Sequence, residues 1–177
     1  MEKKNTEEGM IQVYFGNGKG KTTAALGLIM RAVGHGWPVL VVQFFKKRFT
    51  GELVSVQYLP GVDIFQFGSG EFIMGGKVEE ADRKEWLLGW EMVKKHLLGG
   101  KYRLIILDEL AYAFTLGLLG WDECARILSE RAAGTEVVIT GRTVPEELVS
   151  AADLVSEVRM IKHPAQKGVC AREGIEY

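Results

Sequence analysis

Apolar residues along this chain form short runs that alternate with longer amphipathic stretches, an order typical of strands and helices that take turns. Apolar runs of roughly four to eight residues suit strands that are buried on both faces of a parallel sheet. The predicted strands cover 10–15, 39–45, 62–67, 104–107, 136–140 and 154–160. The alternation predicts an α/β fold with one doubly wound, mostly parallel sheet and helices on both of its faces.

The stretches between these runs have helical periodicity. The predicted helices cover 24–33, 78–98, a segment that begins near 121, and 145–151. In the longest of them, four large apolar residues fall on one face at steps of four, three and four, namely Trp86, Trp90, Val93 and Leu97. We interpret the two tryptophans as core residues and not as part of a cofactor site.

Composition narrows the class of protein. The chain has 177 residues, enough for one domain with a full core, and its net charge of −1 argues against a general nucleic-acid-binding surface. No apolar run approaches membrane-spanning length and the first residues are polar, so we expect a cytoplasmic protein. We predict a flexible arm over 1–9 and a single domain over 10–177. Cys124 and Cys170 are too few to form a disulfide framework or a cysteine metal site.

A glycine-rich stretch lies between the first predicted strand and the first predicted helix. It consists of Gly16, Asn17, Gly18, Lys19, Gly20, Lys21, Thr22 and Thr23. Glycines let backbone N–H groups converge on one anion, and the helix start adds further donors, so this stretch predicts a phosphate-binding loop. Lys21 would bring a charge to the phosphates, and the Thr22 hydroxyl would be a hard ligand for Mg²⁺. Only three residues separate Gly16 from Gly20, one fewer than in the common pattern.

Charged residues follow three further predicted strands. Asp108 and Glu109 come directly after the apolar residues 104–107. Acids at this place in a phosphate-loop protein typically hold Mg²⁺. Arg142 follows the next strand and suits a phosphate, although a surface ion pair would be an ordinary alternative. Residues 46–48 are basic and follow the second strand, either at a ligand-binding edge or as a solvated charge run.

Several motifs together resemble the corrinoid (cobalamin) adenosyltransferases of the phosphate-loop type. They lie at 16–23, 31–36, 42–44 with Lys46, 107–110, 140–142, 152–157, 162–164 and 168–177. The resemblance covers nearly the whole chain in matching order. It implies a single phosphate-loop, RecA-like domain.

The resemblance also implies a reaction. The enzyme would transfer the 5′-deoxyadenosyl group of ATP to the Co(I) of a reduced corrinoid and release triphosphate, in adenosylcobalamin synthesis or salvage. A reducing protein or flavin system would supply Co(I), and the family suggests a homodimer with no nucleic-acid or membrane partner.

The family pattern assigns roles to individual residues. Residues 17–23 and Arg31 would bind the phosphates, and Arg142 would assist them. Thr22 and Glu109 would hold Mg²⁺ or Mn²⁺, with Asp108 next to them. The groups that stabilise the leaving triphosphate would be Lys21, Arg31, Arg142 and the metal. The residues expected to be catalytic are Lys21, Arg142 and Glu109.

A glycine-rich loop at 68–76 carries apolar side chains that either have a function or pack onto the core. By the family pattern, aromatic side chains there push away the lower axial ligand of cobalt. Phe72 matches one of these positions, whereas Met74 stands where many relatives have a tryptophan.

Two other functions fit the glycine-rich loop alone. A nucleotide hydrolase or phosphotransferase would need only the loop and the acids at 108–109, but no dedicated base is evident. An ATP-regulated nucleic-acid-binding module of the recombination-ATPase kind would show strongly salt-dependent DNA binding.

Overall fold

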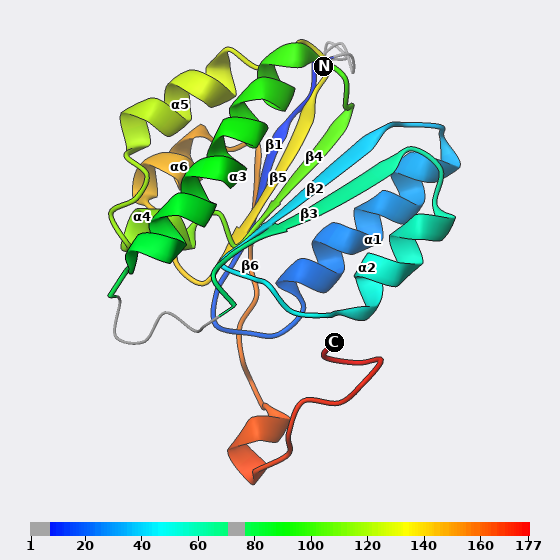
Figure 1. Cartoon of the computed structure of the whole chain (residues 1–177), viewed down its shortest axis with the longest axis vertical. Helices are drawn as coiled ribbons and strands as arrows, with labels where there is room; N and C mark the ends of the chain where they lie inside the picture. Colours follow the sequence, from blue (N-terminus) through cyan, green and yellow to red (C-terminus); the bar gives the residue numbers. More distant parts are fainter. Residues whose placement is uncertain (1–7, 71–76) are drawn as a thin grey trace, which may run out of the picture.

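The computed structural model of the chain describes residues 8–70 and 77–177. Within them, six strands form one sheet in the order β3-β2-β4-β5-β1-β6, with every pair parallel (Figure 1). The strands are β1 (Ile11–Phe15), β2 (Val39–Phe44), β3 (Val62–Phe67), β4 (Leu104–Asp108), β5 (Glu136–Gly141) and β6 (Leu154–Glu157). The predicted α/β fold is confirmed.

Helices cover both faces of the sheet, with α1 and α2 on one face and α3 to α6 on the other (Figure 1). Their bounds are α1 (Lys21–Gly34), α2 (Gly51–Ser55), α3 (Glu80–Gly99), α4 (Tyr112–Thr115), α5 (Trp121–Ser129) and α6 (Glu146–Ala151), with 3-10 turns η1 (Val56–Tyr58) and η3 (Pro164–Lys167). Helix α2 was not predicted from the sequence, because five residues without a buried side chain give no periodic signal. Among the described helices, none is long and apolar enough to cross a membrane.

Alternation along the strands divides the core into two layers. In β2, Val39 and Val41 pack with the residues of α1, while Leu40, Val42 and Phe44 belong to the larger cluster beneath α3 and α5. All six side chains of β2 are buried, which explains the continuous apolar run in this strand.

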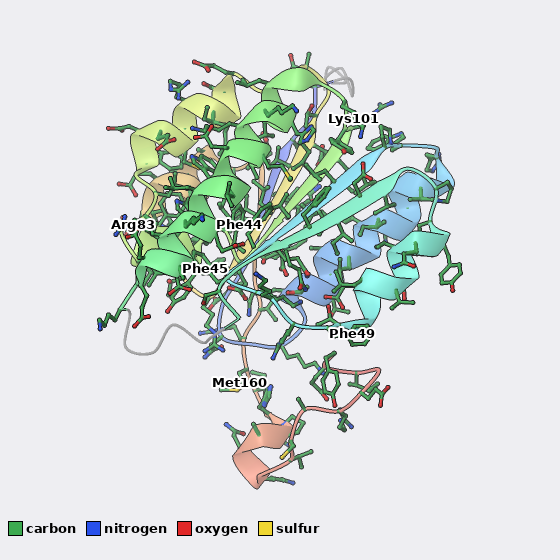
Figure 2. All side chains as sticks on the ribbon, viewed as in Figure 1. Phe44, Phe45, Phe49, Arg83, Lys101 and Met160 are labelled. Carbon is green, nitrogen blue, oxygen red and sulfur yellow. The ribbon has the colours of Figure 1, made fainter. Side chains whose placement is uncertain are left out.

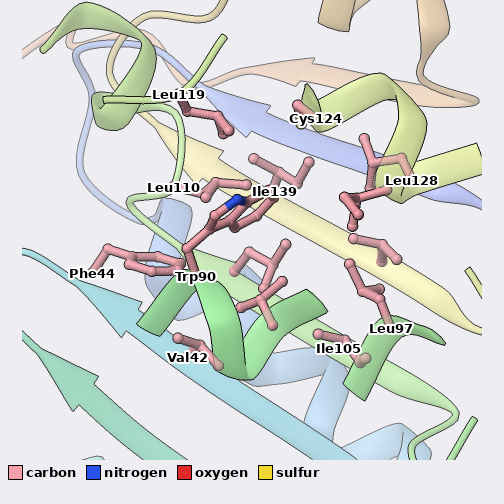
Figure 3. Packing of buried hydrophobic residues seen from close by; sticks show 14 of the residues in the cluster. Val42, Phe44, Trp90, Leu97, Ile105, Leu110, Leu119, Cys124, Leu128 and Ile139 are labelled. Carbon is pink, nitrogen blue, oxygen red and sulfur yellow. The ribbon is translucent and has the colours of Figure 1, made fainter. Parts of the chain in front are cut away.

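The predicted core face of α3 is confirmed. Trp86 and Trp90 are each 3% exposed and stack with ring centroids 5.7 Å apart. Figure 3 shows Trp90 among side chains of the sheet, and its indole N–H donates to Glu123 at 2.7 Å. Cys124 lies in the same cluster, and burial raises the pKa of its thiol to about 12, so it is a core residue with an unreactive thiol.

Strand β6 ends earlier than the sequence predicted, at Glu157 instead of residue 160. Beyond it, the Val158 N–H still donates to the Phe15 carbonyl of β1 at 2.7 Å, and the chain then bonds to the glycine-rich loop. The Val158 carbonyl accepts a hydrogen bond from the Gly18 N–H at 2.8 Å, and the Met160 N–H donates to the Asn17 side chain at 3.0 Å. Figure 2 shows Met160 on the segment that leaves the body of the molecule here.

Candidate active site

The glycine-rich loop, residues 16–23, connects β1 to α1 at the carboxyl edge of the sheet, the lower edge in Figure 1. Gly16 and Gly20 have φ values of 115° and 118°, a left-handed conformation that side chains disfavour. Lys21 begins α1 and turns back into the loop, where its ammonium group donates to the carbonyls of Gly16 and Gly18, each at 2.7 Å. Burial is the main cause that lowers the pKa of Lys21. The loop therefore encloses a largely desolvated cation.

Gly18 is required by the close approach of another backbone segment. A Cβ at this position would lie 2.8 Å from the Val158 carbonyl oxygen. We expect Gly18→Ala to displace the loop, weaken ATP binding at least about tenfold and destabilise the fold by about 1–3 kcal/mol. Calorimetric ATP titration and urea denaturation would measure both effects.

Gly27→Ala is the matched control for this substitution. A Cβ at Gly27, inside α1, would meet no atom within 4 Å, so alanine should raise the stability by about 0.5–1 kcal/mol. If the two alanine variants had the same ATP affinity and the same stability, the close packing of the loop on Val158 would contribute to neither property.

A buried carboxylate, Asp108, joins four elements at the end of β4. Its Oδ1 accepts hydrogen bonds from the hydroxyls of Thr22 at 2.8 Å and Thr140 at 2.7 Å, and its Oδ2 accepts one from the Gln43 amide at 3.2 Å. Asp108 is only 2% exposed, and three donors compensate its desolvation. The contacts place the Thr22 hydroxyl of α1 directly against the end of β4.

Glu109 follows in a left-handed conformation, with a φ of 59°. Its N–H donates to the Thr140 hydroxyl at 2.9 Å, which holds the backbone in this strained turn. Burial and then the charge of Asp108 raise the pKa of the Glu109 carboxyl, while the positive charges of Lys21 and Arg142 oppose this rise. Two acids and two cations therefore meet at this edge of the sheet.

A cavity of about 550 Å³ opens at this edge. It is lined by Thr22, Phe44, Phe45, Lys46, Lys47, Arg48, Gly70, Asp108, Glu109, Tyr112 and Arg142. The three basic residues after β2 line this cavity, and two of them, Lys47 and Arg48, are also exposed to solvent. Its wall combines two acids and the loop hydroxyl with basic and aromatic side chains.

The aromatic part of that wall is built on the core. Phe45 has a φ of 53°, and its ring stacks on Trp86 with an interplanar angle of 1° and meets Tyr112 edge-on. Figure 2 shows Phe44 and Phe45 at the end of β2. Since Trp86 is itself fixed by Trp90, the wall is rigid.

Comparison with known proteins decides the family. The family model of ATP:corrinoid adenosyltransferases (BtuR/CobO/CobP) matches residues 7–177. The chain belongs to this family. The corrinoid adenosyltransferase of Escherichia coli (strain K12) is 39% identical over 171 residues, which cover 97% of this chain and 87% of that protein. The corrinoid adenosyltransferase CobA of Salmonella typhimurium (strain LT2) has the same identity and coverage. A corrinoid adenosyltransferase of Sinorhizobium sp. is 38% identical over 184 residues, which cover 100% of this chain and 84% of that protein.

Most of the residues expected to act in this adenosyltransferase lie together, and one lies apart. Arg31 stands in the last turn of α1, ten positions after Lys21, which corresponds to about 15 Å along a helix. Its charge acts on the Tyr14 phenol, not on the glycine-rich loop. Phe72 and Met74 lie outside the described residues.

Two residues of the adenosyltransferase site received no role from the sequence. Gln43 and Thr140 are both 0% exposed, and both bind Asp108. A polar residue inside an otherwise apolar buried strand was the available signal, because such a group requires a hydrogen-bonding partner. Sequence alone does not identify that partner.

The oxygen atoms at this edge suit a magnesium ion. Thr22, Asp108 and Glu109 line the same cavity and offer hard oxygen ligands. Among residues 8–70 and 77–177, no three His, Cys, Asp or Glu side chains gather into a metal cage. Mg²⁺ usually binds through one or two carboxylates together with phosphates, and two carboxylates line this cavity.

The last residues of the chain return to the glycine-rich loop. The Glu176 carboxylate pairs with Lys19 and with Arg172, the latter at 3.1 Å, and these bonds lower the pKa of Glu176 to about 2. The 168–177 motif that the chain shares with adenosyltransferases thus contacts the loop through one ion pair.

Proposed function

We propose that this chain transfers the 5′-deoxyadenosyl group of ATP to the cobalt of a reduced corrinoid. The electron pair of Co(I) attacks ribose C5′, the Co–C bond forms, and the C5′–O bond breaks as triphosphate leaves with its electrons. The observation that carries the proposal is the cavity whose lining combines the Asp108 network with aromatic and basic side chains, in a chain of this family. The alternatives of a nucleotide hydrolase and of a nucleic-acid-binding module are not favoured by the comparisons.

The proposed roles of the protein groups are electrostatic. Because the nucleophile belongs to the corrinoid, the protein needs no nucleophilic side chain of its own. Lys21 and Arg142 would stabilise the charge on the leaving triphosphate, together with the N–H groups of the glycine-rich loop. A magnesium ion held by Thr22, Glu109 and Asp108 would neutralise part of the same charge.

The aromatic wall provides a proposed place for the corrinoid. Phe45 and Tyr112 line the same cavity as the acids, so a flat macrocycle on these rings would lie near the ribose of a nucleotide bound by the loop. We also propose that Phe72 and Met74 contribute to corrinoid binding. A reducing protein or flavin system would supply Co(I), and the working enzyme would be a homodimer.

An anaerobic absorbance assay tests the proposal. The protein is mixed with Mg-ATP and chemically reduced cobalamin, and the product is then exposed to light. We expect a photolabile Co–C product that depends on ATP, with triphosphate released intact. Formation of ADP and phosphate without that product would favour the hydrolase.

The raised pKa of Glu109 predicts the pH dependence of metal binding. Because burial and Asp108 raise this pKa, Glu109 stays protonated to a higher pH than an ordinary carboxyl, and the proton competes with the metal. The Mg²⁺ concentration for half-maximal ATP binding should therefore fall as the pH rises through the interval between the ordinary and the raised pKa. In the metal-free protein the same shift should make stability decrease with rising pH over that interval, since the folded state binds the extra proton.

Glu109→Gln removes the titrating group at nearly constant shape. Magnesium titrations of this variant at several pH values should show weaker binding that no longer changes across the interval. An unchanged pH dependence would assign the titration to another group.

A further inference from the structure

Gln43 is the only polar residue of β2, and its side chain is completely buried. Its amide nitrogen donates to Asp108 at 3.2 Å and to Glu52 at 3.1 Å, and its amide oxygen accepts from Gln66 at 2.9 Å. The strand register pairs Gln43 with Asp108 of β4 on one side and with Gln66 of β3 on the other. The orientation of the amide is thus defined by three bonds.

The two carboxylates that share this amide connect to different residues of the cavity lining. Asp108 binds the Thr22 hydroxyl of the glycine-rich loop. Glu52, from α2, forms an ion pair of 2.9 Å with Lys46, which also lines the cavity. A continuous chain of bonds therefore runs from the loop through Gln43 to Lys46.

Few side chains suit this position. A neutral amide presents two N–H donors to two anions at once and still accepts a third bond. A lysine or arginine would bring a positive charge that weakens the Lys46 pair, and an apolar side chain would leave both carboxylates short of a donor.

We infer that Gln43 is a positioning residue that fixes the Asp108 carboxylate and the Glu52–Lys46 pair relative to each other. This inference rests on the proposed function only for the magnesium role of Asp108. The orientation of Asp108 toward the metal thereby depends on Glu52, which stands outside the metal's own ligands.

A pair of substitutions at Glu52 tests this dependence. Glu52 is partly exposed, with 18% of its side-chain surface accessible, so both variants should fold. Glu52→Gln removes the charge but keeps an oxygen that accepts the Gln43 bond, whereas Glu52→Leu removes the charge and the acceptor. The readout is the Mg²⁺ concentration for half-maximal ATP binding, measured by calorimetry without corrinoid.

We expect Glu52→Leu to raise this Mg²⁺ concentration about threefold or more, because one of the connected hydrogen bonds is lost. Glu52→Gln should leave the Mg²⁺ concentration nearly unchanged. Gln43→Met should raise it at least about tenfold, because partners of metal ligands have effects of that size. Gln66→Met is the matched control, since it removes the outer amide and keeps both bonds to the carboxylates.

Equal effects of the two Glu52 variants would overturn the inference, because the charge of the pair and not the hydrogen bond would then be responsible. Unchanged Mg²⁺ dependence in Gln43→Met would overturn it as well. A purely structural role would lower the urea midpoint of Gln43→Met and leave the Mg²⁺ dependence of the folded protein as it was. Failure of the proposed function is recognised separately, by a native protein that binds Mg-ATP and forms no Co–C product.

Discussion

Replacing Lys21 with alanine should reduce ATP-dependent adenosyl transfer at least about 100-fold, the scale expected when one preorganised electrostatic group is lost. The Lys21 ammonium lies inside the glycine-rich loop, bonded to the carbonyls of Gly16 and Gly18. It is therefore placed to meet the phosphates of a nucleotide with little further reorganisation. Anaerobic absorbance kinetics and ATP calorimetry would measure the loss.

The same substitution should leave the fold intact. Lys21 belongs to neither core cluster, and burial already disfavours its charge, as its lowered pKa indicates. We expect the free energy of unfolding to change by less than about 1 kcal/mol. Lys95→Ala, at an exposed position late in α3, is the control for loss of a lysine as such. Loss of the native circular dichroism in Lys21→Ala would mean that this residue has a structural role.

Replacing Asp108 with alanine should affect both activity and stability. Three donors, on Thr22, Thr140 and Gln43, would lose their acceptor in a buried place. Unpaired buried groups of this kind cost about 1–3 kcal/mol each, and partial re-pairing makes a total near 3 kcal/mol reasonable. Urea denaturation would measure this loss, and adenosyl transfer should fall to background even where the variant is folded.

Asp108→Asn separates the two roles of the carboxylate. The amide oxygen can still accept from both threonine hydroxyls, so most of the stability should remain, while the negative charge available to a metal is lost. We therefore expect a folded and nearly inactive variant. If Asp108→Ala were as stable as the native protein, the hydrogen-bonded network around Asp108 would not contribute to folding.

The sequence predicted the parts of this fold that have a local signal. Strands such as β2 are almost entirely apolar because both faces of the sheet are covered, and the glycine-rich loop and the acids at 108–109 lie where strands end. Helix α2 has too few residues to show a period, and β6 ends early because Val158 bonds to the loop. Both features depend on contacts that sequence periodicity does not encode.

The candidate site was predictable to the same degree. Thr22, Asp108 and Glu109 line one cavity because parallel strands bring their carboxyl ends to one edge. The role of Gln43 depends on the register between β2 and β4, which its polarity alone does not reveal. The phosphate-binding role expected of Arg31 stays a prediction, and helix geometry places this residue about 15 Å along α1 from Lys21.

The return of the chain end to the glycine-rich loop has a consequence for biosynthesis. The loop is synthesised well before its neighbours Val158 and Glu176, and Glu176 follows Lys19 by 157 residues. Strand β1 likewise forms its hydrogen bonds only after β5 and β6, its partners on both sides, have been synthesised. A nascent chain that has not reached these residues therefore has no finished pocket.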